Sequence, residues 1–151
     1  MAIRNIIHEE DERLFKPSRP VERFDERLHC LLDDMVETMR KAEGVGLAAV
    51  QVGVLRRVVV IDCGDGLLEL VNPRILGQSG KQEGPEGCLS FPGEYFIVER
   101  PNSVIVEAQD RYGETFRVKG EGLKARAFCH EIDHLDGVVF KSKATAPYEG
   151  E

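Results

Sequence analysis

The residues that organise this chain lie at positions 128–135 and read Phe128-Cys129-His130-Glu131-Ile132-Asp133-His134-Leu135. Two histidines four residues apart lie on one face of a helix, so both imidazoles can bind the same metal ion. Glu131 lies about 100° further round a helix of ~3.6 residues per turn, which places its carboxylate beside the metal. There it can move protons for a metal-activated water. The alternative is an amphipathic helix that carries two histidines by coincidence, yet the chain has only 4 histidines in all.

The length of 151 residues predicts a single domain, with residues 141–151 as a flexible tail. Hydrophobic residues make up 42% and charged residues 31% of the chain, which is ordinary for a globular protein. The net charge of -7 argues against nucleic-acid or anionic-membrane binding. The sequence has no run long enough to span a bilayer and no signal-peptide pattern, so we expect a cytoplasmic protein with reduced thiols.

The cysteines are too scattered for a C-x-x-C zinc ribbon, a thioredoxin-type site or a disulfide framework. They are Cys30, Cys63, Cys88 and Cys129. A buried, hydrophobic role is the default for each. Cys88 differs because a glycine-flanked segment holds it shortly before the strand predicted at 95–98, which indicates a positioned side chain.

Hydrophobic periodicity predicts two helices, over residues 24–43 and 123–135. The first is amphipathic and ends at Gly44; the second is apolar on more than one side and should be buried. Strands are predicted over residues 57–62, 68–71, 75–76, 95–98, 103–109 and 115–119, and residues 78–87 are predicted as a polar loop. The pattern favours an α+β fold in which short, mostly antiparallel strands surround a buried metal-binding helix, with the N-terminal helix packed outside.

Three segments carry a family resemblance: Gly44-x-Gly46-Leu47-Ala48-Ala49-x-Gln51, Glu86-Gly87-Cys88-Leu89-Ser90 and His130-Glu131-x-x-His134. Taken alone, the first reads as a tight helix-to-strand connection. In this order, the three resemble the signature motifs of the peptide deformylases, and the resemblance runs from about Ile3 to Phe140. It weakens at the ends: the N-terminal arm lacks the family's usual proline, and many bacterial members continue into a C-terminal helix. We therefore do not expect ribosome docking.

The resemblance implies a metal-dependent hydrolase that removes the N-formyl group from the formyl-methionine of new polypeptides and releases formate. It implies Cys88, His130 and His134 as metal ligands. Three protein ligands leave an open position for water, as catalytic sites require. The family generally uses iron(II) in cells, and zinc, nickel or cobalt suits the same donors.

The resemblance also implies catalytic roles. Glu131 would carry the proton, while the Gln51 side-chain amide and the Leu89 backbone N–H would donate to the oxyanion. Such preorganised donors can each contribute on the order of 3 kcal/mol. Because the family joins its motif glutamate to an arginine at this spacing, we expect Glu86 to pair with Arg100.

Substrate contacts are also implied by the resemblance. The family binds N-formylmethionyl peptides in extended form, here near Gly46. A pocket for the methionine side chain would draw on Val45, Leu123 and Ala127, for which ordinary core positions are the open alternative. Arg126 would either line the pocket rim or reach solvent.

Two other functions stay open. H-E-x-x-H peptidases usually take a third His or Glu ligand downstream, but after His134 this chain has only Glu149 and Glu151. A metal-stabilised binding module without activity is the second alternative. Loss of Glu131 or Gln51 would favour it, and both are present.

Overall fold

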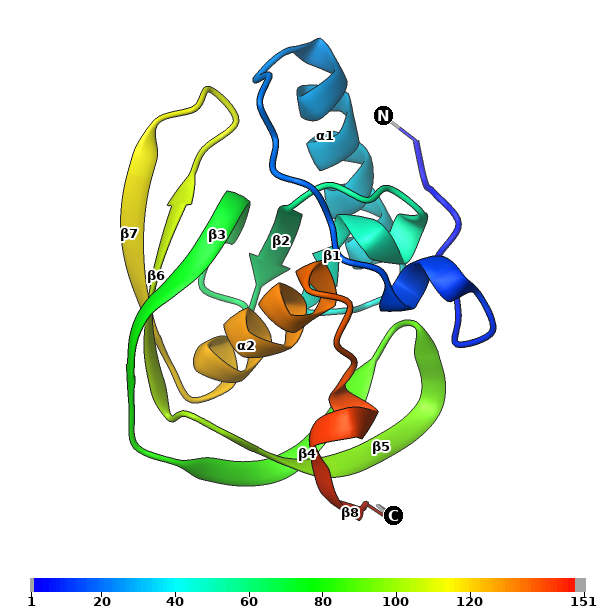
Figure 1. Cartoon of the computed structure of the whole chain (residues 1–151), viewed down its shortest axis with the longest axis vertical. Coiled ribbons are helices and arrows are strands. Elements are labelled where there is room, and N and C mark those ends of the chain that lie inside the picture. Colours follow the sequence, from blue (N-terminus) through cyan, green and yellow to red (C-terminus); the bar gives the residue numbers. More distant parts are fainter. Residues whose placement is uncertain (1, 149–151) are drawn as a thin grey trace.

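The structure is a computed structural model, and it describes residues 2–148 of the chain (Figure 1). In chain order, the elements are the 3-10 helix η1 (Glu12–Phe15), α1 (Glu26–Lys41), β1 (Gly46–Ala48), the 3-10 helix η2 (Ala49–Val52), β2 (Val58–Asp62), β3 (Leu67–Ser79), β4 (Gln82–Cys88), β5 (Phe91–Arg100), β6 (Ser103–Gln109), β7 (Thr115–Glu121), α2 (Leu123–Leu135), the 3-10 helix η3 (Phe140–Lys143) and β8 (Ala144–Pro147). None of the helices among these residues is both long and apolar enough to span a membrane.

The strands form two antiparallel sheets, which confirms the predicted α+β class with mostly antiparallel strands. One sheet has the strand order β1-β2-β3-β6-β7 and the other has the order β4-β5-β8. Helix α2 lies at the centre of Figure 1, with the strands of both sheets around it. Of its 13 residues, 10 are buried, so side chains on every face of this helix have protein neighbours.

Strand β2 explains how the two helices are placed. Successive side chains of a strand point to opposite faces. Val59 therefore packs in one core cluster with Phe128 and Ile132 of α2. Val58 and Val60 pack in another, with the buried face of α1. The two helices thus cover opposite faces of β2. Helix α1 itself starts at an Asp25 cap, whose carboxylate accepts from the Leu28 N–H at 3.3 Å.

The main error in the predicted elements concerns the strands that precede the second sequence motif. Residues 82–88 form β4. The sequence predicts a loop over residues 78–87 instead, because Gly84, Pro85 and Gly87 give the segment a low strand propensity. Its pairing with β5, from Gln82 opposite Arg100 onward, overrides that propensity. Likewise, the two predicted strands at 68–71 and 75–76 are one strand, β3, with a register shift beyond Val71.

A flexible tail is predicted over residues 141–151. In the structure, residues 141–147 belong to η3 and β8. Strand β8 pairs with β5, placing Ala146 opposite Ile97. Just before it, Phe140 is buried and makes edge-to-face contacts with Phe91 and Phe96. The Ala-Thr-Ala-Pro segment carries little strand signal of its own, so only its partner strand defines it. Residues 149–151 lie outside the described part of the chain.

Candidate metal centre and active site

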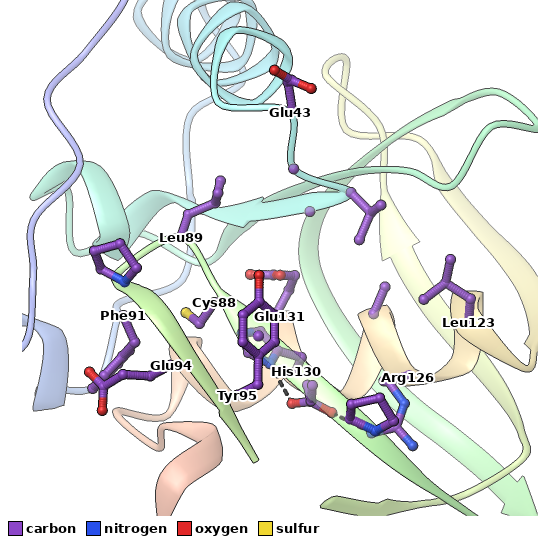
Figure 2. Close-up of a pocket in the computed structure, with 18 of the residues that line it drawn as sticks. Glu43, Cys88, Leu89, Phe91, Glu94, Tyr95, Leu123, Arg126, His130 and Glu131 are labelled. Atoms are coloured by element: carbon purple, nitrogen blue, oxygen red, sulfur yellow. Dashed lines mark hydrogen bonds and ion pairs between the residues drawn. The ribbon is translucent and has the colours of Figure 1, made fainter. Parts of the chain in front are cut away.

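A pocket of about 380 Å³ lies between β1, α2 and the start of β5 (Figure 2). Most of the residues singled out from the sequence line it. They are Val45, Gly46, Cys88, Leu89, Leu123, Ala127, His130 and Glu131. Gln51 and His134 lie behind this lining, and each contacts the Cys88 sulfur. The fold therefore gathers three segments that are distant in the sequence at one site.

Three metal-ligating side chains converge at this pocket. The Cys88 Sγ, at the end of β4, lies 3.3 Å from the His134 Nε2, which lies 3.3 Å from the His130 Nε2. All three donor atoms lie within 4.8 Å of one another. Tetrahedral coordination with bonds of ~2.1 Å to nitrogen and ~2.3 Å to sulfur separates donor atoms by about 3.4 to 3.6 Å. The donor set therefore fits one divalent metal ion.

The two histidine rings differ in proton affinity. Burial lowers the pKa of His134, and the neighbouring His130 lowers it further, so this ring is neutral. Burial also lowers the pKa of His130, but Glu131, Cys88 and Glu86 together raise it to well above its ordinary value. A metal ion accepts only an unprotonated nitrogen, so metal binding would release a proton from His130.

Glu131 is a buried carboxylate that faces the pocket, and its residue is only 5% exposed. Among the described residues, its buried Oε1 has no hydrogen-bond partner. Burial raises the pKa of this carboxyl to about 7, although the nearby His130 lowers it. A buried oxygen without a partner and with this proton affinity is suited to exchange protons near neutral pH.

Glu86 fixes the orientation of the His130 ring. Its Oε2 lies 2.5 Å from the His130 Nδ1, which leaves Nε2 facing the donor cluster. Arg100 binds both carboxylate oxygens, at 3.1 and 2.6 Å, and a further Arg100 N–H donates to Asp133 at 2.7 Å. The predicted Glu86–Arg100 pair is confirmed, with side chains only 4% and 3% exposed. Burial raises the pKa of Glu86, but the bonds from His130 and Arg100 outweigh it and lower the pKa to about 2.

Gln51 is held with its amide nitrogen toward the Cys88 sulfur. The Ala48 N–H donates to the Gln51 Oε1 at 2.9 Å. The amide nitrogen then donates to the Ser90 Oγ at 3.1 Å and lies 3.6 Å from the Cys88 Sγ. Leu89 follows Cys88 directly, and its side chain lies so close to Gly44 that a Cβ at that glycine would come within 2.7 Å of it. Both predicted oxyanion donors thus flank Cys88.

The three residues suggested for a side-chain pocket all line the cavity. Val45 and Leu123 are 41% and 53% exposed, so neither is an ordinary core residue. Ala127 is buried at 4% exposure and lies one helical turn beyond Leu123. In Figure 2, Leu123 and Glu43 stand at the edges of the cavity. Because Leu123 and Ala127 both belong to α2 and line the cavity, the pocket has an apolar wall on the α2 side.

Known proteins share both the sequence and the fold. A family model described as polypeptide deformylase matches residues 3–148. A peptide deformylase of Caldicellulosiruptor bescii is 59% identical over 143 residues, which cover 95% of this chain and 86% of that protein. The chain belongs to the polypeptide deformylase family. Enzymes of this family remove the N-formyl group from nascent polypeptides.

Solved structures of deformylases have the same fold. The peptide deformylase of Thermotoga maritima has a TM-score of 0.94 at 39% identity, covering 96% of this chain and 99% of that one. A peptide deformylase of Synechococcus elongatus in complex with actinonin has a TM-score of 0.90 at 40% identity. That alignment covers 93% of this chain and 78% of the other.

Sequence reasoning missed several residues of this deformylase pocket. Tyr95 and Glu94 line it from β5, and Ser90 positions the Gln51 amide. Tyr95 lies opposite Gly87 in the β4–β5 register, and a Cβ at that glycine would come within 2.6 Å of the ring. Recognition of β4 as a strand, with glycine opposite tyrosine, would have located it. Arg126, left open between rim and solvent, is 7% exposed and bonded to Glu86.

Gly46→Ala is expected to reduce deformylation ~10²-fold, since a misplacement of about 1 Å can cost that much. A Cβ at Gly46 would lie 2.8 Å from the Glu131 Oε2, so the carboxylate must shift. Steady-state kinetics with a formylated peptide measure the effect. Gly77→Ala in β3 is the matched control, because a Cβ there meets no atom within 4 Å. Equal activity of the two variants would contradict a role for the carboxylate position.

Proposed function

We propose that this chain, acting in the cytoplasm as one catalytic domain over residues 1–151, hydrolyses the formyl group from N-formylmethionyl peptides. One observation carries the proposal. In a member of the deformylase family, a Cys–His–His donor set meets, at one open pocket, a buried Glu131 oxygen that no residue in the described part of the chain bonds. The cytoplasm suits this site, because a free thiol such as that of Cys88 stays reduced there.

We propose that Cys88, His130 and His134 hold one divalent ion, iron(II) in the cell, and that zinc, nickel or cobalt can replace it. Bound there, the ion would polarise the formyl carbonyl and lower the pKa of a water molecule toward neutrality. Glu86 supports this role, because it fixes the His130 ring through Nδ1 and leaves Nε2 available.

Glu131 is proposed to carry the proton of the reaction. It accepts a proton from the attacking water, whose oxygen bonds to the formyl carbon, and returns it to the leaving amine as the C–N bond breaks. The products are formate and a peptide with a free amino terminus. The Gln51 amide and the Leu89 N–H donate to the formyl oxygen as that oxygen gains negative charge. The position of both groups beside Cys88 supports this assignment.

The substrate peptide is proposed to lie extended along β1 near Gly46. Strand β1 is the edge strand of its sheet, so its outer edge can pair with an added strand. The methionine side chain would then enter the apolar part of the pocket formed by Val45, Leu123 and Ala127. The exposure of the first two at the cavity supports this assignment.

Peptide assays test the function directly. The metal-loaded enzyme is incubated with formyl-Met-Ala-Ser, acetyl-Met-Ala-Ser and free Met-Ala-Ser, and formate and peptide products are quantified. We expect formate from the first peptide and no product from the other two. Cleavage of the internal bonds of the unformylated peptide would instead identify a peptidase. Absence of all products from a protein that binds cobalt stoichiometrically would indicate a binding module.

The iron form is expected to lose activity in air, whereas the nickel and zinc forms persist at different levels. Iron(II) beside an open position reacts with oxygen, and the Cys88 thiolate can itself be oxidised to sulfenic and higher acids. The protein is loaded anaerobically, exposed to air and assayed, with mass spectrometry of the Cys88 peptide. Inactivation with Cys88 unmodified would assign the loss to the metal alone. Full activity after prolonged exposure with iron still bound would rule out both routes.

A further inference from the structure

Arg126 is a buried arginine in the wall of the pocket. It lies on α2 one turn before His130 and is 7% exposed. Its NH1 donates to the Glu86 Oε1 at 2.8 Å and to the Val98 carbonyl oxygen at 3.1 Å. Figure 2 shows the side chain extending from α2 toward the carboxylate. A charged group that is buried in this way needs defined partners, and this one has them.

The Glu86 carboxylate is therefore held from two elements. Its Oε1 accepts from Arg126 of α2 and from Arg100 of β5. Its Oε2 accepts from Arg100 and lies against the His130 Nδ1. With Asp133, which pairs with Arg100 and with Lys143, the cluster contains two carboxylates, two guanidinium groups and one ammonium group. Removal of Arg126 would leave the buried Glu86 carboxylate, beside the ring of a proposed metal ligand, with one guanidinium partner instead of two.

The same helix face also shapes the pocket. Leu123, Arg126, Ala127 and His130 follow the i, i+3, i+4, i+7 spacing of one helical face, and all four line the cavity. The arginine stem thus lies between the apolar wall and the donor cluster, and its guanidinium group points to Glu86 rather than to solvent. An arginine fork can satisfy a carboxylate and a carbonyl together, which a lysine ammonium matches poorly.

We propose that Arg126 is a positioning residue that links substrate selection to metal-ligand geometry. Through Glu86 it holds the His130 ring, and with its stem it closes the pocket for the first side chain of the substrate. This inference rests on the proposed function, and it adds a second arginine to the predicted Glu86–Arg100 pair.

Two substitutions separate these effects. Arg126→Met keeps the length of the stem but removes the charge and the hydrogen bonds. Arg126→Ala removes both the stem and the charge. Arg126→Lys keeps the charge but lacks the fork of N–H donors, and it is measured beside the other two variants. Lys124→Met is the matched control, because it removes one charge from the same helix turn, where Lys124 pairs with Asp65 at 2.6 Å and with no other described residue.

Cobalt affinity is measured by chelator competition, and the visible spectrum of the cobalt form reports ligand geometry. For Arg126→Met we expect about 10-fold weaker cobalt binding, a shifted spectrum and a lower kcat, as for partners of metal-bound histidines. Arg126→Lys should lie between this variant and the wild type. Wild-type cobalt affinity and a wild-type spectrum in Arg126→Met and Arg126→Lys would overturn the positioning role. Lys124→Met should retain the wild-type affinity and spectrum.

Selectivity is measured as the ratio of kcat/KM for formyl-phenylalanyl and formyl-methionyl peptides. Arg126→Ala should raise this ratio about 10-fold, because the shortened side chain enlarges the pocket, while Arg126→Met should not change it. An unchanged ratio in Arg126→Ala would overturn the role in the pocket wall. Failure of the proposed function itself would appear separately, as a wild-type protein that binds cobalt but does not release formate.

Discussion

Replacement of Glu131 by glutamine is expected to leave the metal bound and to reduce deformylation ~10²–10⁴-fold or more. The carboxamide has nearly the size of the carboxylate but cannot accept a proton. Because no described residue bonds to the Glu131 Oε1, the substitution should disturb few contacts in the fold. The loss is therefore expected in kcat rather than in stability or metal content.

The measurement combines metal content, thermal unfolding and steady-state kinetics. Glu121→Gln is the matched control, since that side chain is 65% exposed on β7. Burial raises the pKa of Glu131 to about 7, and a bound cation would lower it again. The ionised base is lost as pH falls, so the acidic limb of kcat/KM should lie at or below about pH 7. Near-normal turnover by metal-loaded Glu131→Gln would refute the role as proton carrier.

Replacement of Arg100 by alanine should destabilise the protein by roughly 3–5 kcal/mol, because it removes one partner from a buried ion pair. Glu86 and Asp133 would lose three short bonds to guanidinium nitrogens. Metal affinity should also fall about 10- to 100-fold, since Glu86 orients the His130 ring. Denaturant unfolding and chelator competition measure the two effects.

Arg117→Ala is the control for this substitution. The Arg117 side chain is 69% exposed and pairs with Glu107 on the surface, so its loss should cost only ~0–1 kcal/mol. If Arg100→Ala changed neither stability nor metal affinity, the buried pair would have no energetic role.

The pH dependence follows from Glu86. Its pKa is lowered from 4.5 to about 2 in the folded protein. A carboxyl with a depressed pKa stabilises the fold fully above its unfolded value and loses this contribution as pH falls through the folded value. The difference in unfolding free energy between wild type and Arg100→Ala should therefore shrink as pH falls from about 4.5 to about 2.

Local sequence determined the helices and the chemistry on them. Helix α2 covers the predicted residues 123–135, and the i, i+4 spacing alone places His130 and His134 on one face. The amphipathic period likewise located α1, which is shorter than predicted by two residues at each end. These features depend on contacts between residues a few positions apart, so they can be predicted from the sequence alone. The family motifs added Cys88 and the Glu86–Arg100 pair, and the structure brings these residues together.

The tertiary structure decided the rest. The Gly84-Pro85-Glu86-Gly87 segment belongs to β4 because it pairs with β5, and residues 144–147 form β8 because they also pair with β5. Tyr95 reaches the pocket through this register, and the partners of the buried Arg126 come from Glu86, Val98 and Gln82. Such contacts join residues far apart in the sequence, and no local pattern encodes which partner a strand or a charge will meet.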